Sequence, residues 1–406
     1  MQRIPRLIAA FISFSSIGIK FMFPLFLAYF GTDKDFSFLL VTYNTILLSG
    51  MIFSLEHNKF YHRKAIHENK IKKINFYERV YFDQTLILKL IPLIITLILF
   101  DKFSILQRIL IFLIVYIDLH LVEECRKNEV IGNYLRNVMI WGARMAFPVI
   151  LFIITSLIIK DLFLNLLFLN ILFSYILIIN LFKVRICNIK NLKIKKNIFI
   201  NITVRTWQYA LLTILGLLNP LVDKFVLLNF KEYSMLQTIS LWAVFGNLVA
   251  LFISEFINKP YKPKIMNFLK IKDFNRIFKN IISYQILLMV FVFIILIFYR
   301  TNLEFLLKPS FEFNLLQILG CCFISASIPL NTLFNTTLYG YKKDNSILIF
   351  TIFEFFLKYI FSIITILYLG AYYLPYILSL EALVILLAKY VYVRKSINKF
   401  ISNITS

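Results

Sequence analysis

Ionisable side chains lie deep inside the long apolar stretches of this sequence. They are the cations Lys20, Arg144, Lys224 and Lys358 and the acids Asp223 and Glu354. On insertion scales, a charged side chain at the centre of a bilayer costs roughly 2.5–3.5 kcal/mol, so such residues normally face a hydrated cavity or a partner. A cation in such a cavity binds anionic groups such as phosphate, and a carboxylate there binds a proton or Na⁺. We therefore take these six residues as the candidate site.

Spacing along a helix gives each of these residues an alternative, structural role. Glu354 and Lys358 are four residues apart, so they share a helix face and can neutralise each other. Asp223 and Lys224 are adjacent and point about 100° apart on a helix, so each needs another partner or a cavity. The choice between a structural pair and a functional site stays open for both pairs.

Lys20 and Arg144 have no acid within one turn of their own helices. Each therefore requires either a hydrated cavity or an acid on another helix. Glu381 also lies deep in an apolar run. Other charges lie near the ends of the runs, where long side chains reach the head groups: Lys89, Arg108, Asp118, Glu255 and Lys389.

The composition requires a lipid environment for most of the chain. Apolar residues make up 60% of the 406 residues and charged residues only 16%. A soluble domain has roughly a quarter charged residues to cover its core. This excludes a soluble enzyme, a disordered chain and a secreted disulfide scaffold.

The apolar residues fall into about twelve runs of the ~20 residues that a membrane-spanning helix needs. We expect spans at about 7–30, 36–55, 84–100, 103–122, 138–159, 161–182, 207–230, 236–257, 281–299, 315–338, 347–369 and 371–393. Very short connections join them into hairpins. The predicted fold class is all-α, a polytopic membrane protein with about 12 transmembrane helices in two six-helix bundles.

The positive charges are distributed unequally between the two sides of these spans. The connections on the side of the termini carry 30 Lys and Arg residues, against 6 on the hairpin side. Cytoplasmic loops collect Lys and Arg, so we expect both termini in the cytoplasm. This bias accounts for the net charge of +23 without a nucleic-acid partner. The basic segment Ile265–Phe278 has apolar residues at helical spacing and is typical of an interfacial helix on anionic lipid.

The chain divides near residue 200, with six spans on each side. We predict an N-terminal six-helix bundle over residues 1–200 and a C-terminal one over residues 201–406. An even number of spans per half makes the halves parallel, which is a common transporter plan with the substrate path between the halves. Pro220 follows Asn219 in the seventh span, removes a backbone hydrogen bond and is expected to kink that helix.

Several kinds of chemistry are absent from the sequence. No Walker-type phosphate loop occurs, so the chain is not expected to hydrolyse ATP. His57, His62 and His67 are five residues apart, which does not place two ligands on one helix face. The four cysteines, Cys125, Cys187, Cys321 and Cys322, have no zinc or disulfide spacing. We expect neither an enzyme nor a cofactor or resident metal.

Together these features resemble a known transporter family. The basic inner loops, the cations in the first and seventh spans and the segment Asn219–Phe230 (NPLVDKFVLLNF) look like those of polysaccharide-repeat (O-antigen, Wzx-type) flippases. The segment Phe256–Ile265 (FINKPYKPKI) is similar to the Pro-containing exit from that family's eighth span. These flippases belong to the multidrug/oligosaccharidyl-lipid/polysaccharide exporter superfamily.

The resemblance implies a substrate, a mechanism and partners. It implies an undecaprenyl-diphosphate-linked oligosaccharide that crosses the bacterial inner membrane by ion-coupled alternating access. Lys20, Arg144, Lys224 and Lys358 would bind the diphosphate, and Asp223 or Glu354 would bind the coupling H⁺ or Na⁺. A polysaccharide polymerase and a chain-length protein would be the partners, beside membrane lipids.

Two alternatives stay open. One is a cation-coupled drug or small-molecule antiporter of the same superfamily, which should favour carboxylates over cations in its cavity. The other is a membrane polysaccharide polymerase. Such an enzyme usually needs a sizeable outward loop with Arg residues, and the longest one here, Arg300–Asn314, has a single Arg.

Overall fold

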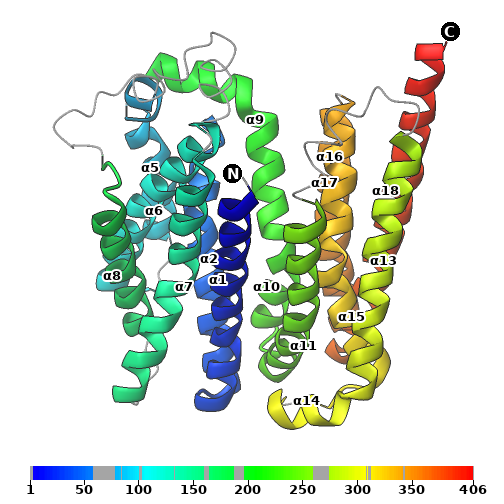
Figure 1. Ribbon diagram of the computed structural model, residues 1–406. Coiled ribbons are helices and arrows are strands. Elements are labelled where there is room, and N and C mark those ends of the chain that lie inside the picture. The colour runs from blue at the N-terminus through cyan, green and yellow to red at the C-terminus, as the bar shows by residue number, and fades with distance from the viewer. Residues whose placement is uncertain are drawn as a thin grey trace. The chain divides into compact units, whose positions relative to one another are not determined.

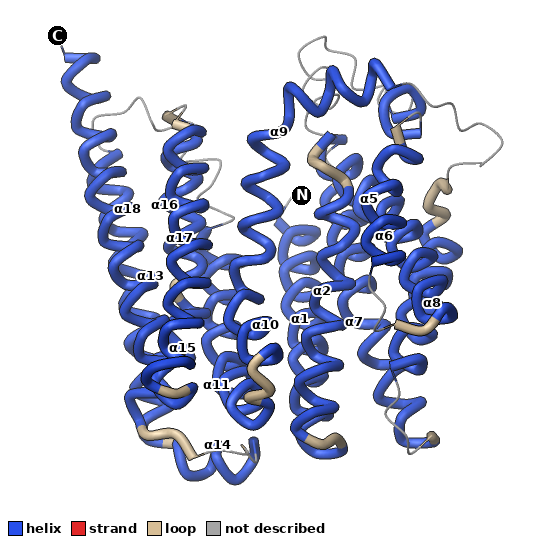
Figure 2. The backbone as a smooth tube through the Cα atoms, turned by 180° about the vertical axis from the view of Figure 1, so that it is seen from behind, coloured by secondary structure: helices blue, strands red, loops and turns tan. Residues whose placement is uncertain are grey.

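The structure is a computed structural model. It describes residues 3–57, 78–83, 85–99, 103–131, 133–159, 164–186, 196–258, 274–307, 309, 312–341 and 343–405. All regular structure in these ranges is helical, as Figure 2 shows. The predicted all-α fold class is therefore confirmed.

Eleven of the helices in the described ranges are long and apolar enough to cross a membrane. Each corresponds to one of the predicted runs. The remaining run, at 84–100, corresponds to α5 (Leu86–Leu99), which has 14 described residues. About twelve spans are thus consistent with the structure, and the chain is a multi-pass membrane protein by the length and composition of its helices.

One compact unit comprises Met1–Phe23 and Leu39–Leu217. Besides α5 and the π-helical turn η2 (Arg79–Asp83), it contains α6 (Ile105–Ile131), α7 (Tyr134–Ile158) and α8 (Leu164–Phe182) (Figure 1). It also contains most of α1 (Arg3–Phe30), α2 (Asp33–Phe53) and α9 (Lys196–Leu218). Helices α6, α7 and α8 pack against one another. An aromatic cluster fills part of the core, with the Phe23 ring 4.6 Å from Tyr43 and 5.4 Å from Phe152.

The second unit comprises Pro24–Phe38 and Leu218–Ser406. Its main helices are α10 (Val222–Asn229), α11 (Tyr233–Phe252), α13 (Phe274–Phe298), α14 (Arg300–Leu307), α15 (Leu315–Ala326), α16 (Ile328–Gly340), α17 (Asp344–Ile364) and α18 (Leu374–Thr405). Shorter turns join them: η4 (Asn219–Leu221), η5 (Ile253–Asn258), η6 (Thr365–Leu369) and η7 (Ala371–Tyr373). Helix α18 packs against α15, α16 and α17. The predicted division into residues 1–200 and 201–406 stays a prediction.

The seventh span is interrupted at the place where the sequence predicts a kink. Helix α9 ends at Leu218, and a 3₁₀ turn covers Asn219–Leu221 before α10 begins. Pro220 has no backbone N–H and cannot continue the hydrogen-bond ladder of α9. The interruption places the polar Asn219 and Asp223 at the start of a new helix.

Two glycines permit close helix packing. A Cβ at Gly246 of α11 would lie 2.2 Å from the carbonyl oxygen of Cys322 on α15. A Cβ at Gly50 of α2 would lie 1.9 Å from an Asp118 carboxylate oxygen on α6. Any other residue at these positions would force the neighbouring helix or side chain to move.

Large apolar side chains cover outer faces of the helices. On α13, Leu287, Phe291 and Phe298 are exposed. Exposed apolar surface of this extent is expected of a helix that contacts lipid rather than water. Part of the predicted interfacial segment Ile265–Phe278 lies outside the described residues, as do His62, His67 and Cys187; its last residues, from Phe274, begin α13.

Candidate functional site

Arg144 lies on α7 in the core of the first unit, and its charge is neutralised by an acid on another helix. Its guanidinium forms a bidentate ion pair with Asp118 of α6, and both side chains are 0% exposed. It also donates to the Leu47 carbonyl of α2, while Asp118 accepts the Gly50 N–H at 3.0 Å. Of the two alternatives left open for Arg144, the structure has the cross-helix acid.

The expectation that Asp118 snorkels from a span end is wrong. The predicted span ended at residue 122, but α6 continues to Ile131, so Asp118 lies within the helix and not at its end. Lys389 differs from prediction for the same reason, because α18 runs on to Thr405. Lys89 is also buried instead of reaching the head groups. The predicted spans end where charged residues begin in the sequence. An amphipathic helix can continue past those charges, so the real helix ends lie further along the chain.

Lys358 of α17 forms an ion pair with Asp223 of α10 in the second unit. The Lys358 ammonium lies 3.1 Å from Asp223 and donates to the Asn219 carbonyl at 2.9 Å. Both charged side chains are buried. Lys358 thus joins α17 to the residues at the interruption of the seventh span.

Glu354, one turn before Lys358, pairs with α18 and not with its own neighbour. Its carboxylate accepts from Lys389 at 2.9 Å, from the Asn219 amide at 2.8 Å and from the Asn331 amide at 3.3 Å. Lys389 also donates to the Asn331 side-chain oxygen at 2.5 Å. The alternative that Glu354 and Lys358 neutralise each other is therefore not what the structure has.

These contacts bring three predicted site residues, Asp223, Glu354 and Lys358, into one polar cluster that α10, α16, α17 and α18 build. Sequence reasoning missed Lys389 as a member. Its signal was present, since a lysine eight residues after the deep Glu381 is on the same helix within an apolar stretch. Asn219 and Asn331 were visible only as polar residues without a role.

Two further ionisable groups, Glu381 and Lys224, form no ion pair with a described residue. Glu381 of α18 is 6% exposed, and its Oε1 accepts no hydrogen bond from the described residues. Lys224 of α10 is half-buried and makes no hydrogen bond or ion pair with them. It interacts electrostatically with Asp223 and Lys358. Within the described part of the cluster, these two groups are the candidates to bind a ligand or a proton.

Lys20 is half-buried on α1 in the first unit, which also contains the fully buried Arg144 of α7. The other four predicted site residues belong to the second unit. Lys20 and the cluster around Glu354 therefore belong to different units. No group of three or more His, Cys, Asp or Glu side chains in the described ranges is arranged to hold a metal ion.

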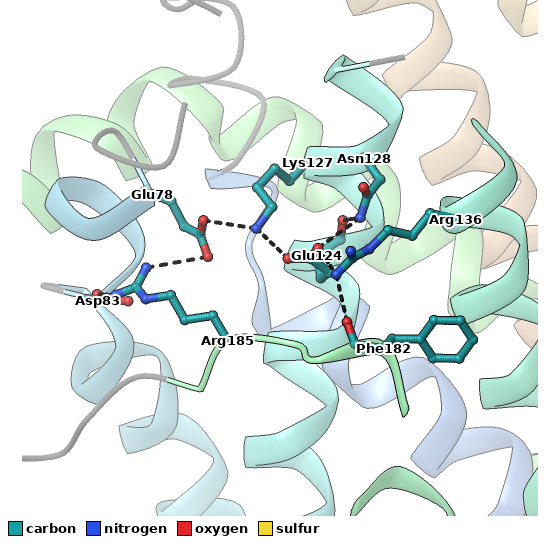
Figure 3. Close-up of polar contacts among 8 residues, drawn as sticks. All are labelled: Glu78, Asp83, Glu124, Lys127, Asn128, Arg136, Phe182 and Arg185. Atoms are coloured by element: carbon teal, nitrogen blue, oxygen red, sulfur yellow. Dashed lines mark hydrogen bonds and ion pairs between the residues drawn. The ribbon is translucent and has the colours of Figure 1, made fainter. Parts of the chain in front are cut away.

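A second polar network in the first unit begins on η2, as Figure 3 shows. Arg185, just after α8, pairs with Asp83 and lies 3.6 Å from the Glu78 carboxylate. Lys127 of α6 reaches the other Glu78 oxygen at 3.4 Å. Burial raises the pKa of Glu78, and the charges of Lys127 and Arg185 oppose that shift.

The network continues through Glu124 of α6 (Figure 3). Glu124 pairs with Lys127 and accepts from Asn128 at 3.0 Å and from Arg136 of α7 at 3.0 Å. Arg136 also donates to the Phe182 carbonyl at the end of α8 at 2.7 Å. The network therefore links η2, α6, α7 and the end of α8. Its charges are paired with one another, which is typical of a structural role.

The comparisons with known proteins show the fold. No family model and no curated protein sequence matches the chain. Among solved structures, an inward-facing multidrug resistance MATE family transporter of the MOP superfamily matches with a TM-score of 0.58 and 10% identity over 98% of this chain and 99% of that one. An outward-facing structure of such a transporter matches with a TM-score of 0.56 and 11% identity, over 98% and 96%.

A MOP superfamily transporter from Pyrococcus furiosus, described as having reverse polarity of its binding pocket, matches with a TM-score of 0.52 and 11% identity over 98% of this chain and 95% of that one. At these identities the likeness establishes the fold of the MATE transporters over nearly the whole chain. The superfamily that the sequence resemblance implies stays a prediction.

Proposed function

We propose that this protein is a transporter that works by alternating access and carries a lipid-linked oligosaccharide with an anionic diphosphate across the bacterial inner membrane. Its likeness to both inward-facing and outward-facing MATE structures supports the transport cycle. An amphipathic substrate of this kind cannot move its sugars through hydrocarbon unaided.

The observation that carries the choice of substrate is the state of Lys224. Arg144 and Lys358 are neutralised by Asp118 and Asp223, so their charges position helices. Lys224 keeps a half-buried ammonium without an ion pair to any described residue. An ammonium without an ion pair beside a polar cluster suits a phosphate group. Lys20 of the first unit stays a predicted phosphate-binding residue.

The polar cluster of the second unit would couple transport to an ion. Glu381 keeps a carboxylate oxygen without a hydrogen bond beside the Glu354–Lys389 pair. A proton or Na⁺ bound by Asp223, Glu354 or Glu381 would change the charge balance of the cluster. The expected polymerase and chain-length partners belong to this proposal.

The test is a flipping assay with protein reconstituted in liposomes and a fluorescent prenyl-diphosphate oligosaccharide. Replacing Lys224 by methionine (Lys224→Met) should lower the initial rate roughly ten- to a hundredfold, because a hydrogen bond to a charged group contributes about 1.5–3 kcal/mol. Lys231→Met, which removes an exposed lysine after α10, should leave the rate unchanged. Equal rates for all three proteins would refute the substrate assignment.

A drug antiporter is the second candidate, and the state of Glu381 favours it. If the buried carboxylate binds organic cations, liposomes should accumulate a cationic dye under a proton or Na⁺ gradient. Glu381→Gln should then abolish dye uptake, while Lys224→Met should leave it intact. Dye transport without flipping of the diphosphate lipid would replace the first proposal by this one.

A further inference from the structure

One side of helix α16 carries polar side chains that the rest of the chain leaves accessible. We call it the polar face of α16, and it consists of Asn331, Thr332, Asn335 and Thr336. Thr332 is exposed and the other three are half-buried. Residues one and four apart on a helix are neighbours on one side, so these side chains lie together over two turns. The opposite side is buried and largely apolar, with Leu333 and Leu338 among its residues.

This arrangement is the reverse of a helix that faces lipid. The polar face belongs to the membrane span Leu315–Tyr339. Other helices of the same unit expose apolar residues instead, such as Leu287 and Phe291 on α13 and Phe353 and Phe356 on α17. Polar side chains turned to hydrocarbon lose their hydrogen bonds to water and gain nothing in return. A polar outer side and an apolar inner side indicate that this face of α16 contacts water.

The usual role of such residues in a span is to join helices by hydrogen bonds, and the polar face does not have it. The Thr332 hydroxyl donates to the Ile328 carbonyl at 2.9 Å, and the Thr336 hydroxyl donates to the Thr332 carbonyl at 2.8 Å. Both bonds stay within α16. The buried Oδ1 atom of Asn335 accepts no hydrogen bond from the described residues.

Asn331 connects the polar face to the charged cluster of the second unit. Its amide donates to Glu354 at 3.3 Å, and its side-chain oxygen accepts from Lys389 at 2.5 Å. Asn331 is therefore held in place by the cluster. Thr332, Asn335 and Thr336 continue the polar surface along the helix from that point.

The chemistry of the polar face suits a neutral ligand that is rich in hydroxyl groups. Its residues carry no charge. A threonine hydroxyl that donates to a carbonyl still has lone pairs to accept a hydrogen bond, and an asparagine amide can both donate and accept. Sugar hydroxyls also do both. An organic cation would instead need apolar or aromatic contacts and an opposite charge.

We propose that the polar face of α16 binds the sugar hydroxyls of the transported lipid-linked oligosaccharide through Thr332, Asn335 and Thr336. This inference rests on the proposed function and assigns the surface that recognises the sugars, whereas Lys224 is assigned to the diphosphate. Asn331 is a positioning residue, because it reaches the cluster and not the ligand.

The first test measures binding of two fluorescent lipids to the purified full-length protein in detergent. One is a prenyl diphosphate that carries a chain of N-acetylglucosamine residues, and the other is the same lipid without sugars. The wild type should bind the sugar-bearing lipid more tightly. Thr336→Val should weaken this binding roughly two- to tenfold, the usual effect of one lost hydrogen bond, and Asn335→Leu by at least as much. Neither variant should alter binding of the lipid without sugars.

Thr337→Val is the matched control. Thr337 forms the same kind of hydrogen bond, from its hydroxyl to the Leu333 carbonyl at 2.9 Å, but its side chain is 0% exposed on the other side of α16. This variant should bind both lipids as the wild type does. If the wild type binds both lipids equally, or if Thr336→Val and Asn335→Leu keep its preference, the sugar-binding surface is refuted and the proposed function stands. Failure of the wild type to bind either lipid refutes both.

The second test asks directly whether the polar face contacts water, and it does not depend on the substrate. Single cysteines are placed in liposomes with a charged methanethiosulfonate on both sides, in a Cys187→Ser background where the other native cysteines are buried. The thiolate forms readily only in water. Thr336→Cys should therefore react, and Phe291→Cys on the apolar side of α13 should not.

Ligand protection joins the two tests. The sugar-bearing lipid should slow the labelling of Thr336→Cys, and the lipid without sugars should not. If Thr336→Cys reacts no faster than Phe291→Cys, the polar face is not in water and the inference is overturned. Equal labelling with both lipids overturns it as well.

Discussion

At the scale of single residues, the deep charges of this protein are mostly held by acids from other helices. Arg144 with Asp118 and Lys358 with Asp223 each join two helices inside one unit. A buried pair is weak evidence for stability against apolar replacement, but removing one partner leaves an uncompensated charge. The consequence can be measured at Asp118.

Asp118→Asn should destabilise the protein by about 3–5 kcal/mol, because the fully buried Arg144 guanidinium would lose its counter-charge. Unfolding curves in detergent measure this loss. Adding Arg144→Met to Asp118→Asn should recover much of it, as a double-mutant cycle would reveal. Glu304→Gln is the control: it breaks a partly exposed pair with Arg300 and should cost less than about 1 kcal/mol. Equal losses at both sites would contradict the pairing.

The raised pKa of Glu78 predicts that the free energy of unfolding depends on pH. Burial raises its pKa, so the folded state binds this proton more tightly than the unfolded chain, whose glutamate pKa is about 4.3. The free energy of unfolding should therefore fall as pH rises from that value through the folded-state pKa. Glu78→Gln should flatten this part of the stability profile.

The matched control for this profile is Glu129→Gln, which alters an exposed glutamate of α6. It should leave the pH dependence as in the wild type. If Glu78→Gln follows the wild-type curve as well, another group is responsible for the slope.

At the scale of elements, close helix contacts depend on small residues more than on apolar pattern. Helix α11 approaches α15 at Gly246, where any Cβ would overlap the backbone of Cys322. Backbone cannot move aside as the end of a flexible side chain can. The contact between these helices should therefore be sensitive to one methyl group.

Gly246→Ala should destabilise the second unit by about 1–3 kcal/mol, the usual cost of overpacking. Gly216→Ala on α9 provides the control, because a Cβ there meets nothing within 4 Å. Alanine favours helix over glycine, so this control should be neutral or stabilising by up to about 1 kcal/mol. Thermal unfolding of both variants measures these changes in stability. If Gly246→Ala is as stable as the wild type, the tight contact between α11 and α15 is excluded.

At the scale of the whole molecule, the charge of the connections predicts its orientation in the membrane. Lys34 is exposed on the hairpin side, and Lys183 is exposed at the end of α8 on the basic side. The positive-inside rule places Lys34 outside and Lys183 in the cytoplasm. Neither placement follows from the helices alone.

Single cysteines at these positions test the orientation in intact cells. A membrane-impermeant maleimide should label Lys34→Cys directly and Lys183→Cys only after permeabilisation. The background should carry Cys187→Ser, while the buried Cys125, Cys321 and Cys322 are expected to stay unreactive. Labelling of Lys183→Cys in intact cells would reverse the predicted topology.

The sequence by itself determined the helical class and the position of nearly every span. Hydropathy over ~20 residues is a local sum, so it is readable without knowing the neighbours. A kink at Pro220 was predictable for the same reason, since the missing N–H acts within one turn. Span ends were less certain, and α6 and α18 run well past them.

Only the tertiary structure decided which charges meet. Glu354 lies one turn from Lys358 yet pairs with Lys389, and Arg144 finds Asp118 across 26 residues of chain. Such partners depend on how each helix is rotated and which helix lies beside it. Those choices are made by packing over the whole unit, and no local pattern in the chain encodes them.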